Sequence, residues 1–157
     1  MLSLFDLSLQ LNGFSIKKAK VQLHTIINLS ETDFVTFVEN QKREILHFHL
    51  KHNSFYGAFA KEASFENWDK VPILTKKELQ IPLQNRLSEG FTTTNCYTNK
   101  TSGSSGTPFS FAKDKYTHAL TWASNMYRFG WFGIDFNSSY QARFYGIQLD
   151  FIGYKKE

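Results

Sequence analysis

Cysteine is almost absent from this sequence. Cys96 is the single cysteine among 157 residues, so a disulfide framework within the chain is excluded. A lack of disulfides is typical of proteins in a reducing compartment, and we expect a cytoplasmic protein. No neighbour of Cys96 in the sequence looks like a dedicated base, so we interpret this thiol as a small packing side chain.

Long apolar runs and clusters of like charge are missing as well. The first residues include no basic region, and Asp6 interrupts their apolar character, so no signal peptide is predicted. No uninterrupted apolar segment is long enough to span a bilayer, and we expect no membrane span. The net charge of +4 is spread along the chain, whereas a groove for nucleic acid usually carries clustered Lys and Arg. We therefore predict no nucleic-acid partner.

The composition that remains is typical of a globular chain. Hydrophobic residues make up 41% and charged residues 20%, and the length predicts one domain that buries a core. The 16 phenylalanines predict many aromatic contacts in that core.

Helical periodicity characterises the first part of the chain. Apolar residues recur at helical spacing over residues 15–29 and again over residues 31–51. Ser30 is predicted to cap the second of these helices, because acidic residues follow it near the positive helix end. Asn53 and Ser54 break the pattern, and residues 55–59 predict a short further helix.

A further helix start is predicted from two side chains that can bond to the first backbone N–H groups of a helix. Thr75 and Glu78 have the spacing of a capping box, which predicts a helix from about Lys76. Pro82 would end that helix early, because it has no backbone N–H.

Strand patterns appear only after Gly90. Residues 91–100 and 108–112 predict two strands of a hairpin-like unit. Asp114 is predicted to cap a helix over residues 115–129, which the glycines at 130 and 133 end. Residues 141–146 predict a buried strand. The fold class is therefore α/β, with residues 1–89 mainly helical and residues 90–157 mixed.

Three histidines lie close together in the sequence, but their spacing does not favour a metal site. His47 and His49 fall on different faces of the predicted helix, and only His49 and His52 are near neighbours. No cysteine or carboxylate has a ligand-like spacing to them. We interpret them as ordinary exposed or half-buried histidines.

The densest cluster of small polar residues connects the two predicted strands. It consists of Thr101, Ser102, Gly103, Ser104, Ser105, Gly106 and Thr107. Glycine lets a backbone approach a ligand closely, successive backbone N–H groups can form an anion-binding nest, and hydroxyls add donors. This combination predicts a polyphosphate-binding loop.

Two other kinds of loop share part of this composition, a Walker A loop and a flexible linker. A Walker A loop needs Lys and Ser or Thr after its last glycine and a helix directly behind, whereas Thr107, Pro108 and Phe109 follow here. A flexible linker has similar composition. The aromatic residues on both sides of the loop, Tyr97, Phe109 and Phe111, are unusual for a linker.

The loop and its surroundings resemble a known family. The string TSGSSGTP resembles the phosphate-binding signature of adenylate-forming enzymes. Together with VPILTKKEL at residues 71–79, NSFYGAF at residues 53–59 and FGWFG at residues 129–133, it resembles the phenylacetate–CoA ligase family and its capsule-biosynthesis (CapK-like) branch. The resemblance extends from about residue 11 to residue 146 and implies that residues 1–157 are an N-terminal portion of an adenylate-forming domain.

The resemblance implies an activity and its reactants. Family members activate a carboxylic acid with ATP and magnesium and then transfer the acyl group to coenzyme A, and a role in capsule or surface polysaccharide biosynthesis is implied for the CapK-like branch. By resemblance, residues 101–107 would hold the β- and γ-phosphates. Many loops of the superfamily end in Pro-Lys, whereas this one ends in Pro108 and Phe109. Lys113 and Lys115 are the nearest following cations.

Parts of the family pattern have no counterpart in these residues. They are the aromatic motif near adenine, the aspartate that binds ribose and the lysine of the small C-terminal domain. We therefore expect the chain to be inactive alone, and two explanations are open: the chain is a fragment of a longer enzyme, or a second, C-terminal chain completes it. Two alternatives stay open, which are a non-catalytic nucleotide- or phosphate-binding module and an interaction protein.

Overall fold

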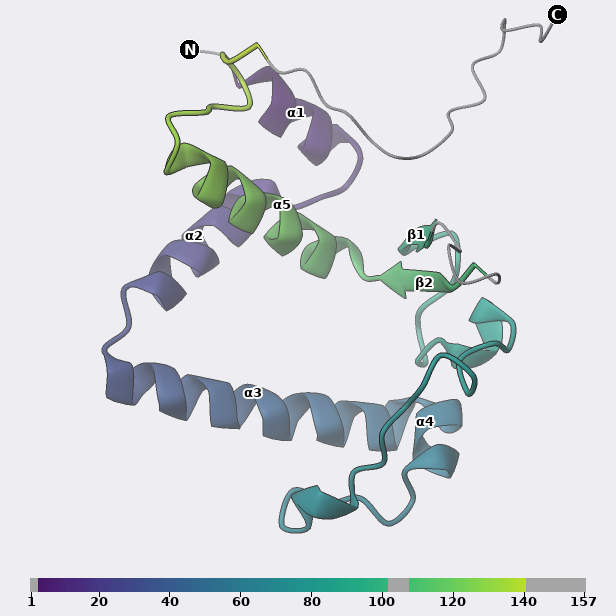
Figure 1. Ribbon diagram of the computed structural model, residues 1–157. Helices are drawn as coiled ribbons and strands as arrows, with labels where there is room; N and C mark the ends of the chain where they lie inside the picture. The colour runs from purple at the N-terminus through teal and green to yellow at the C-terminus, as the bar shows by residue number, and fades with distance from the viewer. Residues whose placement is uncertain (1–2, 102–107, 141–157) are drawn as a thin grey trace, which may run out of the picture.

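Helices and a small two-stranded antiparallel sheet make up the structure, a computed structural model that describes residues 3–101 and 108–140 (Figure 1). The fold class is mixed α/β. The elements are α1 (Leu4–Leu11), α2 (Ile16–Ile27), α3 (Glu31–His52), α4 (Ser54–Phe59), the 3-10 helices η1 (Trp68–Lys70) and η2 (Leu83–Arg86), β1 (Tyr97–Lys100), β2 (Ser110–Lys113) and α5 (Lys115–Gly130). The strand predicted for residues 141–146 lies outside the described residues.

The helix boundaries follow from side-chain caps. The Ser30 hydroxyl accepts the backbone N–H of Asp33 at 3.2 Å, which satisfies a donor that has no partner within α3. Asn53 separates α3 from α4, and its side-chain oxygen accepts the N–H of Tyr56 at 2.9 Å. The predicted helices at residues 15–29, 31–51, 55–59 and 115–129 are confirmed, with ends that shift by a few residues.

The first hydrophobic core lies among α1, α2 and α5. Ile16 and Ala19 of α2 are fully buried against Ala119 and Ala123 of α5, and Leu9 of α1 completes this cluster. Alanine at such contacts lets two helix axes approach closely. Phe5 and Phe14 pack around the cluster without being fully buried, so the phenylalanines make the expected contacts from the edge of the core.

A second, separate core lies under the C-terminal half of α3. Leu46 is buried with Ala60 and Ala63, and Leu50 and Tyr56 pack against them. Figure 1 shows α3 and α4 on the opposite side of the molecule from α1, α2 and α5.

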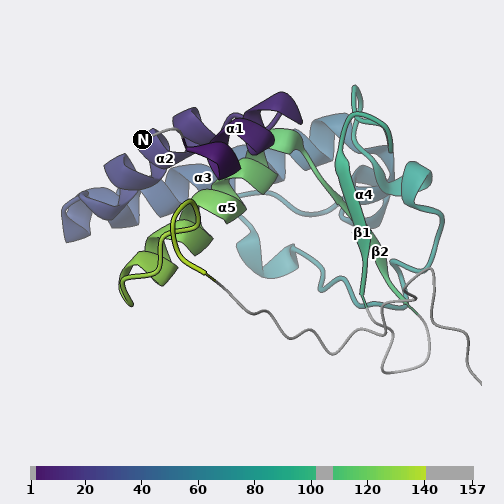
Figure 2. The same cartoon turned by 90° about the horizontal axis from the view of Figure 1, so that it is seen from above.

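The β-hairpin lies at one end of these helical layers (Figure 2). Its strands pair from Tyr97 opposite Lys113 to Lys100 opposite Ser110. The helix η2 contacts both α4 and β2, and α5 follows β2 directly. The hairpin therefore connects the two helical groups.

Residues 76–79 form a turn, so the helix predicted from Lys76 is wrong. The capping-box contacts are present, because Thr75 N–H donates to the Glu78 carboxylate at 2.9 Å and Lys77 N–H donates to the Thr75 hydroxyl at 3.3 Å. A helix cannot continue past them, because Pro82 has no N–H and disfavours helical backbone at Ile81.

The strand predicted for residues 91–100 is shorter than expected, and the second strand is shifted towards Lys113. Thr92 N–H donates to the Asn95 side chain at 2.8 Å and Cys96 N–H to the Thr92 carbonyl at 3.2 Å. These local bonds form a turn in place of a strand ladder.

Helix α1 was not predicted. Its residue Phe5 packs edge-on against Trp122 of α5 at 5.1 Å between ring centroids, and Asn137 accepts its N–H at 3.0 Å. Among the described residues, no helix is long and apolar enough to cross a membrane.

Candidate functional site

The hairpin holds the two ends of the predicted phosphate loop together. Thr101 N–H donates to the Phe109 carbonyl, and Phe109 N–H donates to the Thr101 hydroxyl oxygen, each at 2.9 Å. One bond between peptide groups and one bond to a side chain thus extend the contact of the two strands by one residue pair. Thr101 and Pro108 are both exposed, so both ends of the loop are accessible to solvent.

Thr101 is the one predicted site residue that the structure describes. It lies directly after β1, and because its hydroxyl oxygen accepts a hydrogen bond, the hydroxyl hydrogen stays available to donate. The other predicted site residues lie outside the described residues: Ser102, Gly103, Ser104, Ser105, Gly106 and Thr107.

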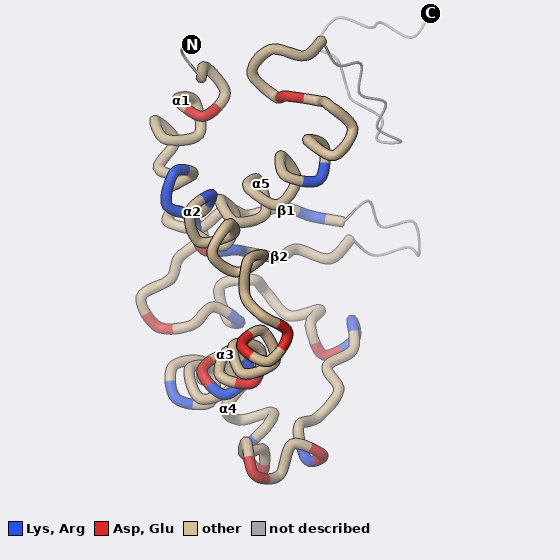
Figure 3. The backbone as a smooth tube through the Cα atoms, turned by 90° about the vertical axis from the view of Figure 1, so that its left-hand side faces the viewer, with Lys and Arg blue, Asp and Glu red and all other residues tan. Residues whose placement is uncertain are grey.

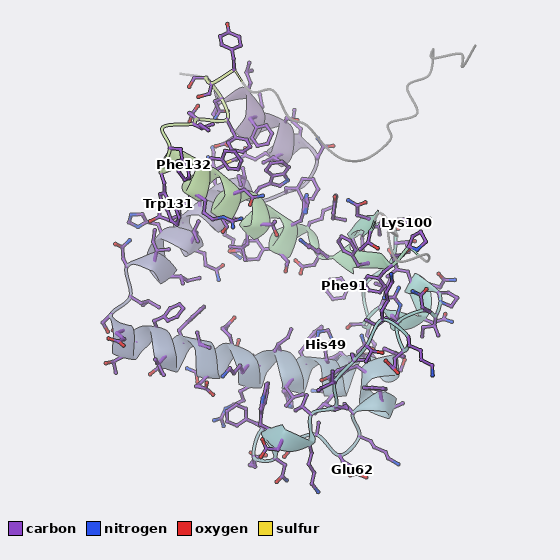
Figure 4. All side chains as sticks on the ribbon, viewed as in Figure 1. His49, Glu62, Phe91, Lys100, Trp131 and Phe132 are labelled. Atoms are coloured by element: carbon purple, nitrogen blue, oxygen red, sulfur yellow. The ribbon has the colours of Figure 1, made fainter. Side chains whose placement is uncertain are left out.

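Two basic side chains lie near the loop end of the hairpin. Lys100 is exposed at the end of β1 (Figure 4), and Arg86 of η2 donates from Nη2 to the Ser110 carbonyl at 2.7 Å. The Arg86 guanidinium also lies 5.0 Å from the centre of the Phe109 ring, close to the loop exit. Figure 3 shows acidic and basic positions spread along the described backbone, with several basic positions close together on α2.

The two lysines that follow the loop contact the helices. The Lys113 ammonium lies 3.4 Å from the Thr121 hydroxyl of α5, and the Lys115 ammonium lies 3.3 Å from the carbonyl oxygen of Asn12. The Lys115 ammonium is also 6.0 Å from the centre of the Phe14 ring. Both side chains therefore fasten α5 to its neighbours.

Asp114 and His118 anchor the hairpin to α5. The Asp114 carboxylate accepts the N–H groups of Tyr116 and Thr117 at 2.8 and 2.9 Å, as predicted for the helix cap. His118 stacks on Tyr97 of β1 with 3.7 Å between ring centroids. Burial lowers the pKa of His118, and the nearby Lys113 ammonium lowers it further. The imidazole is therefore neutral near pH 7.

The described surroundings of Cys96 and of the α3 histidines do not form a metal site or activate the thiol. Burial is the largest cause that raises the pKa of the Cys96 thiol, which keeps it protonated at neutral pH. His49 lies 3.4 Å from the Ser88 hydroxyl, and His52 lies 3.2 Å from the Glu89 carboxylate. In residues 3–101 and 108–140, no group of three or more His, Cys, Asp or Glu could hold a metal ion.

Arg86 is the residue near the site that sequence reasoning missed. No motif marks it, because the residues that it contacts, Ser110 and Phe109, lie more than twenty positions away in the sequence.

Comparison with known proteins gives no match. No family model matches the chain, and neither a curated protein nor a solved structure matches it.

Proposed function

We propose that this chain is the polyphosphate-binding N-terminal part of an ATP-dependent acid–CoA ligase. The observation that carries the proposal is the closure of the hairpin at Thr101 and Phe109, where two hydrogen bonds of 2.9 Å hold the ends of residues 102–107 together. A glycine- and hydroxyl-rich segment with fixed ends loses less conformational freedom when it wraps an anion than a free linker would.

The residues of the loop would act as hydrogen-bond donors. The Thr101 hydroxyl, the other hydroxyls and the backbone N–H groups would contact β- and γ-phosphate oxygens, on which negative charge grows as pyrophosphate leaves. These groups suit an anion. Residues 101–107 contain no carboxylate, so phosphate oxygens would hold a magnesium ion, which would neutralise their charge.

Binding of ATP by the full chain tests the proposal, with glycine and serine variants compared in calorimetry. Gly106→Val adds a branched side chain where the backbone must approach phosphate, so we expect it to abolish binding. Ser104→Ala removes one donor among several, and we expect a loss of about tenfold. Equal losses in both variants, or no binding of ATP by the unchanged protein, would contradict the proposal.

Pyrophosphate exchange separates an enzyme from a non-catalytic binding module. Acyl adenylation needs an acid aligned with the α-phosphorus in addition to a held polyphosphate. We expect ATP binding without acid-dependent exchange. Exchange with aryl or aliphatic acids clearly above the Gly106→Val background would show that the chain catalyses adenylation by itself.

A second candidate function, an interaction protein, is favoured by exposed aromatic residues at the end of α5. Trp131 and Phe132 lie just beyond the end of α5 (Figure 4) and are 65% and 79% exposed, and the Trp131 ring contacts Tyr127 edge-on with 5.5 Å between ring centroids. Aromatic side chains of this kind are enriched at protein interfaces. A stable oligomer or partner complex without nucleotide would support this candidate over the first.

A further inference from the structure

A groove of about 340 Å³ lies between α3, α4 and the segment that contains η1 and η2. Its walls are mostly apolar and include Ile45, Leu46, Trp68, Val71 and Leu74. Ile45 is 53% exposed and Trp68 is 44% exposed, so part of this apolar lining faces solvent. The volume and the lining are those of a small-molecule site.

Asn53 and His49 are polar residues in the lining of the groove. Asn53 is 6% exposed, and its side chain bonds to Tyr56, to the Arg86 carbonyl and to Ser88. It therefore has a structural role. Burial lowers the pKa of His49, which lines the groove as a neutral imidazole near pH 7.

Arg86 is the one charged residue in the lining of the groove. Its Nε donates to the Ile81 carbonyl at 3.2 Å and its Nη2 donates to the Ser110 carbonyl at 2.7 Å. Within the described part of the chain, Arg86 forms no ion pair with a carboxylate and its Nη1 donates no hydrogen bond. Two carbonyl oxygens and the Phe109 ring compensate only part of this half-buried positive charge, and an anionic ligand would complete the compensation.

We propose that this groove binds a small amphipathic oxyanion, a compact apolar body that ends in one carboxylate or phosphate, with Arg86 as the charged contact. The apolar lining excludes a highly charged ligand such as a free polyphosphate, and the positive charge disfavours a cation. The proposal goes beyond the function proposed above, because the groove requires neither nucleotide nor the loop.

Calorimetry with the full chain and without nucleotide tests the proposal. The probes are 3-phenylpropanoate, phenyl phosphate and the neutral 3-phenylpropanamide. We expect saturable binding of an anion, with the amide weaker by about tenfold or more, because a hydrogen bond to a charged group is stronger than one to a neutral group. The anion with the higher affinity shows whether the groove prefers a carboxylate or a phosphate.

Three variants locate the binding. Arg86→Gln should reduce the affinity for the anion to that for the amide, whereas Arg43→Gln, which changes an exposed arginine of α3 outside the groove, should leave both affinities unchanged. Leu74→Trp should weaken the anion and the amide together, because it fills the groove. Arg86→Gln also loses the bond to Ser110 and could fail to fold. In that case Leu74→Trp and the comparison of acid with amide still decide whether the anion binds in the groove.

Three outcomes would overturn the proposal. They are no saturable binding of any anion, equal affinity for acid and amide, and an equal loss in Arg43→Gln and Arg86→Gln, which would indicate non-specific attraction to positive charge. ATP binding is tested separately, with the full chain and its variants in residues 101–107. A negative result at the groove therefore does not contradict the proposed function.

Discussion

His118 lies where the hairpin meets α5, and its protonation state is set by its neighbours. Trp122 donates its indole N–H to Nε2 of His118 at 3.0 Å, so the proton of the neutral imidazole is on Nδ1. Nδ1 is buried and has no hydrogen-bond partner among the described residues. A second proton would break the bond to Trp122 and place a charge beside Lys113, which agrees with the lowered pKa.

This arrangement predicts a stability that depends on pH. The pKa of His118 is lower in the folded than in the unfolded chain, so the unfolded chain binds the proton first as the pH falls. The free energy of unfolding should therefore decrease below about pH 6.5, towards the lowered pKa of the folded state, and stay constant above it. Urea unfolding at pH 7.5 and pH 5.5 measures the change.

A matched pair of variants assigns the effect to its source. His118→Gln keeps an acceptor for Trp122 without a titrating group, so the decrease should be smaller, and His47→Gln on the exposed face of α3 should not alter it. Part of the decrease should persist in His118→Gln, because burial also lowers the pKa of His49. An unchanged decrease in His118→Gln would show that this imidazole does not control the pH response.

Among the described elements, α2 and α5 have the most extensive contact with each other. Ala19 and Ala119 are both 0% exposed and Ala123 is 2% exposed, so no space is left at this contact for a larger side chain. The hairpin leads directly into α5, and its position therefore depends on how α5 packs against α2.

Enlarging one of these alanines should separate the two helices. We expect Ala119→Leu to lower the free energy of unfolding by about 1–3 kcal/mol, because a well-packed core accepts extra methylene groups only with strain. Ala58→Leu on the exposed side of α4 adds the same atoms and should change stability by less than about 0.5 kcal/mol. Urea unfolding followed by circular dichroism compares the two, and equal effects would refute close packing of α2 against α5.

The whole molecule exposes aromatic surface at one end. Four aromatic side chains near the end of α5 are exposed: Tyr127 by 43%, Phe129 by 42%, Trp131 by 65% and Phe132 by 79%. Exposed apolar patches of this kind favour association, because contact removes their surface from water.

We therefore predict that the protein self-associates as its concentration rises. Sedimentation velocity measures the distribution of species, and the double change Trp131→Ser and Phe132→Ser should shift it towards monomer. Phe91→Ser, which changes a 37% exposed phenylalanine near the hairpin, is the matched control and should leave the distribution as it is. A monomer at all concentrations would remove the support for an interaction surface at this end.

The sequence by itself determined those elements whose signals are local. Ser30 and Asp114 cap α3 and α5 through bonds to residues two or three positions away, and the strands are brought together by the chain that directly connects them. A local cap satisfies the first N–H groups of a helix wherever that helix packs, so such boundaries can be predicted without tertiary contacts. The composition of residues 101–107 predicts a phosphate loop without reference to a fold, and this stays a prediction.

Only the tertiary structure decided the features that depend on distant residues. Helix α1 forms where Phe5 meets Trp122, and Arg86 reaches both Ser110 and the lining of the groove. The turn at Thr75 has a capping bond that the sequence predicts, but that Leu79 of this turn lines the groove beside α3 and α4 is visible only in the tertiary structure. Burial and hydrogen bonding between residues far apart in the chain outweigh local propensity, and a sequence pattern does not contain that information.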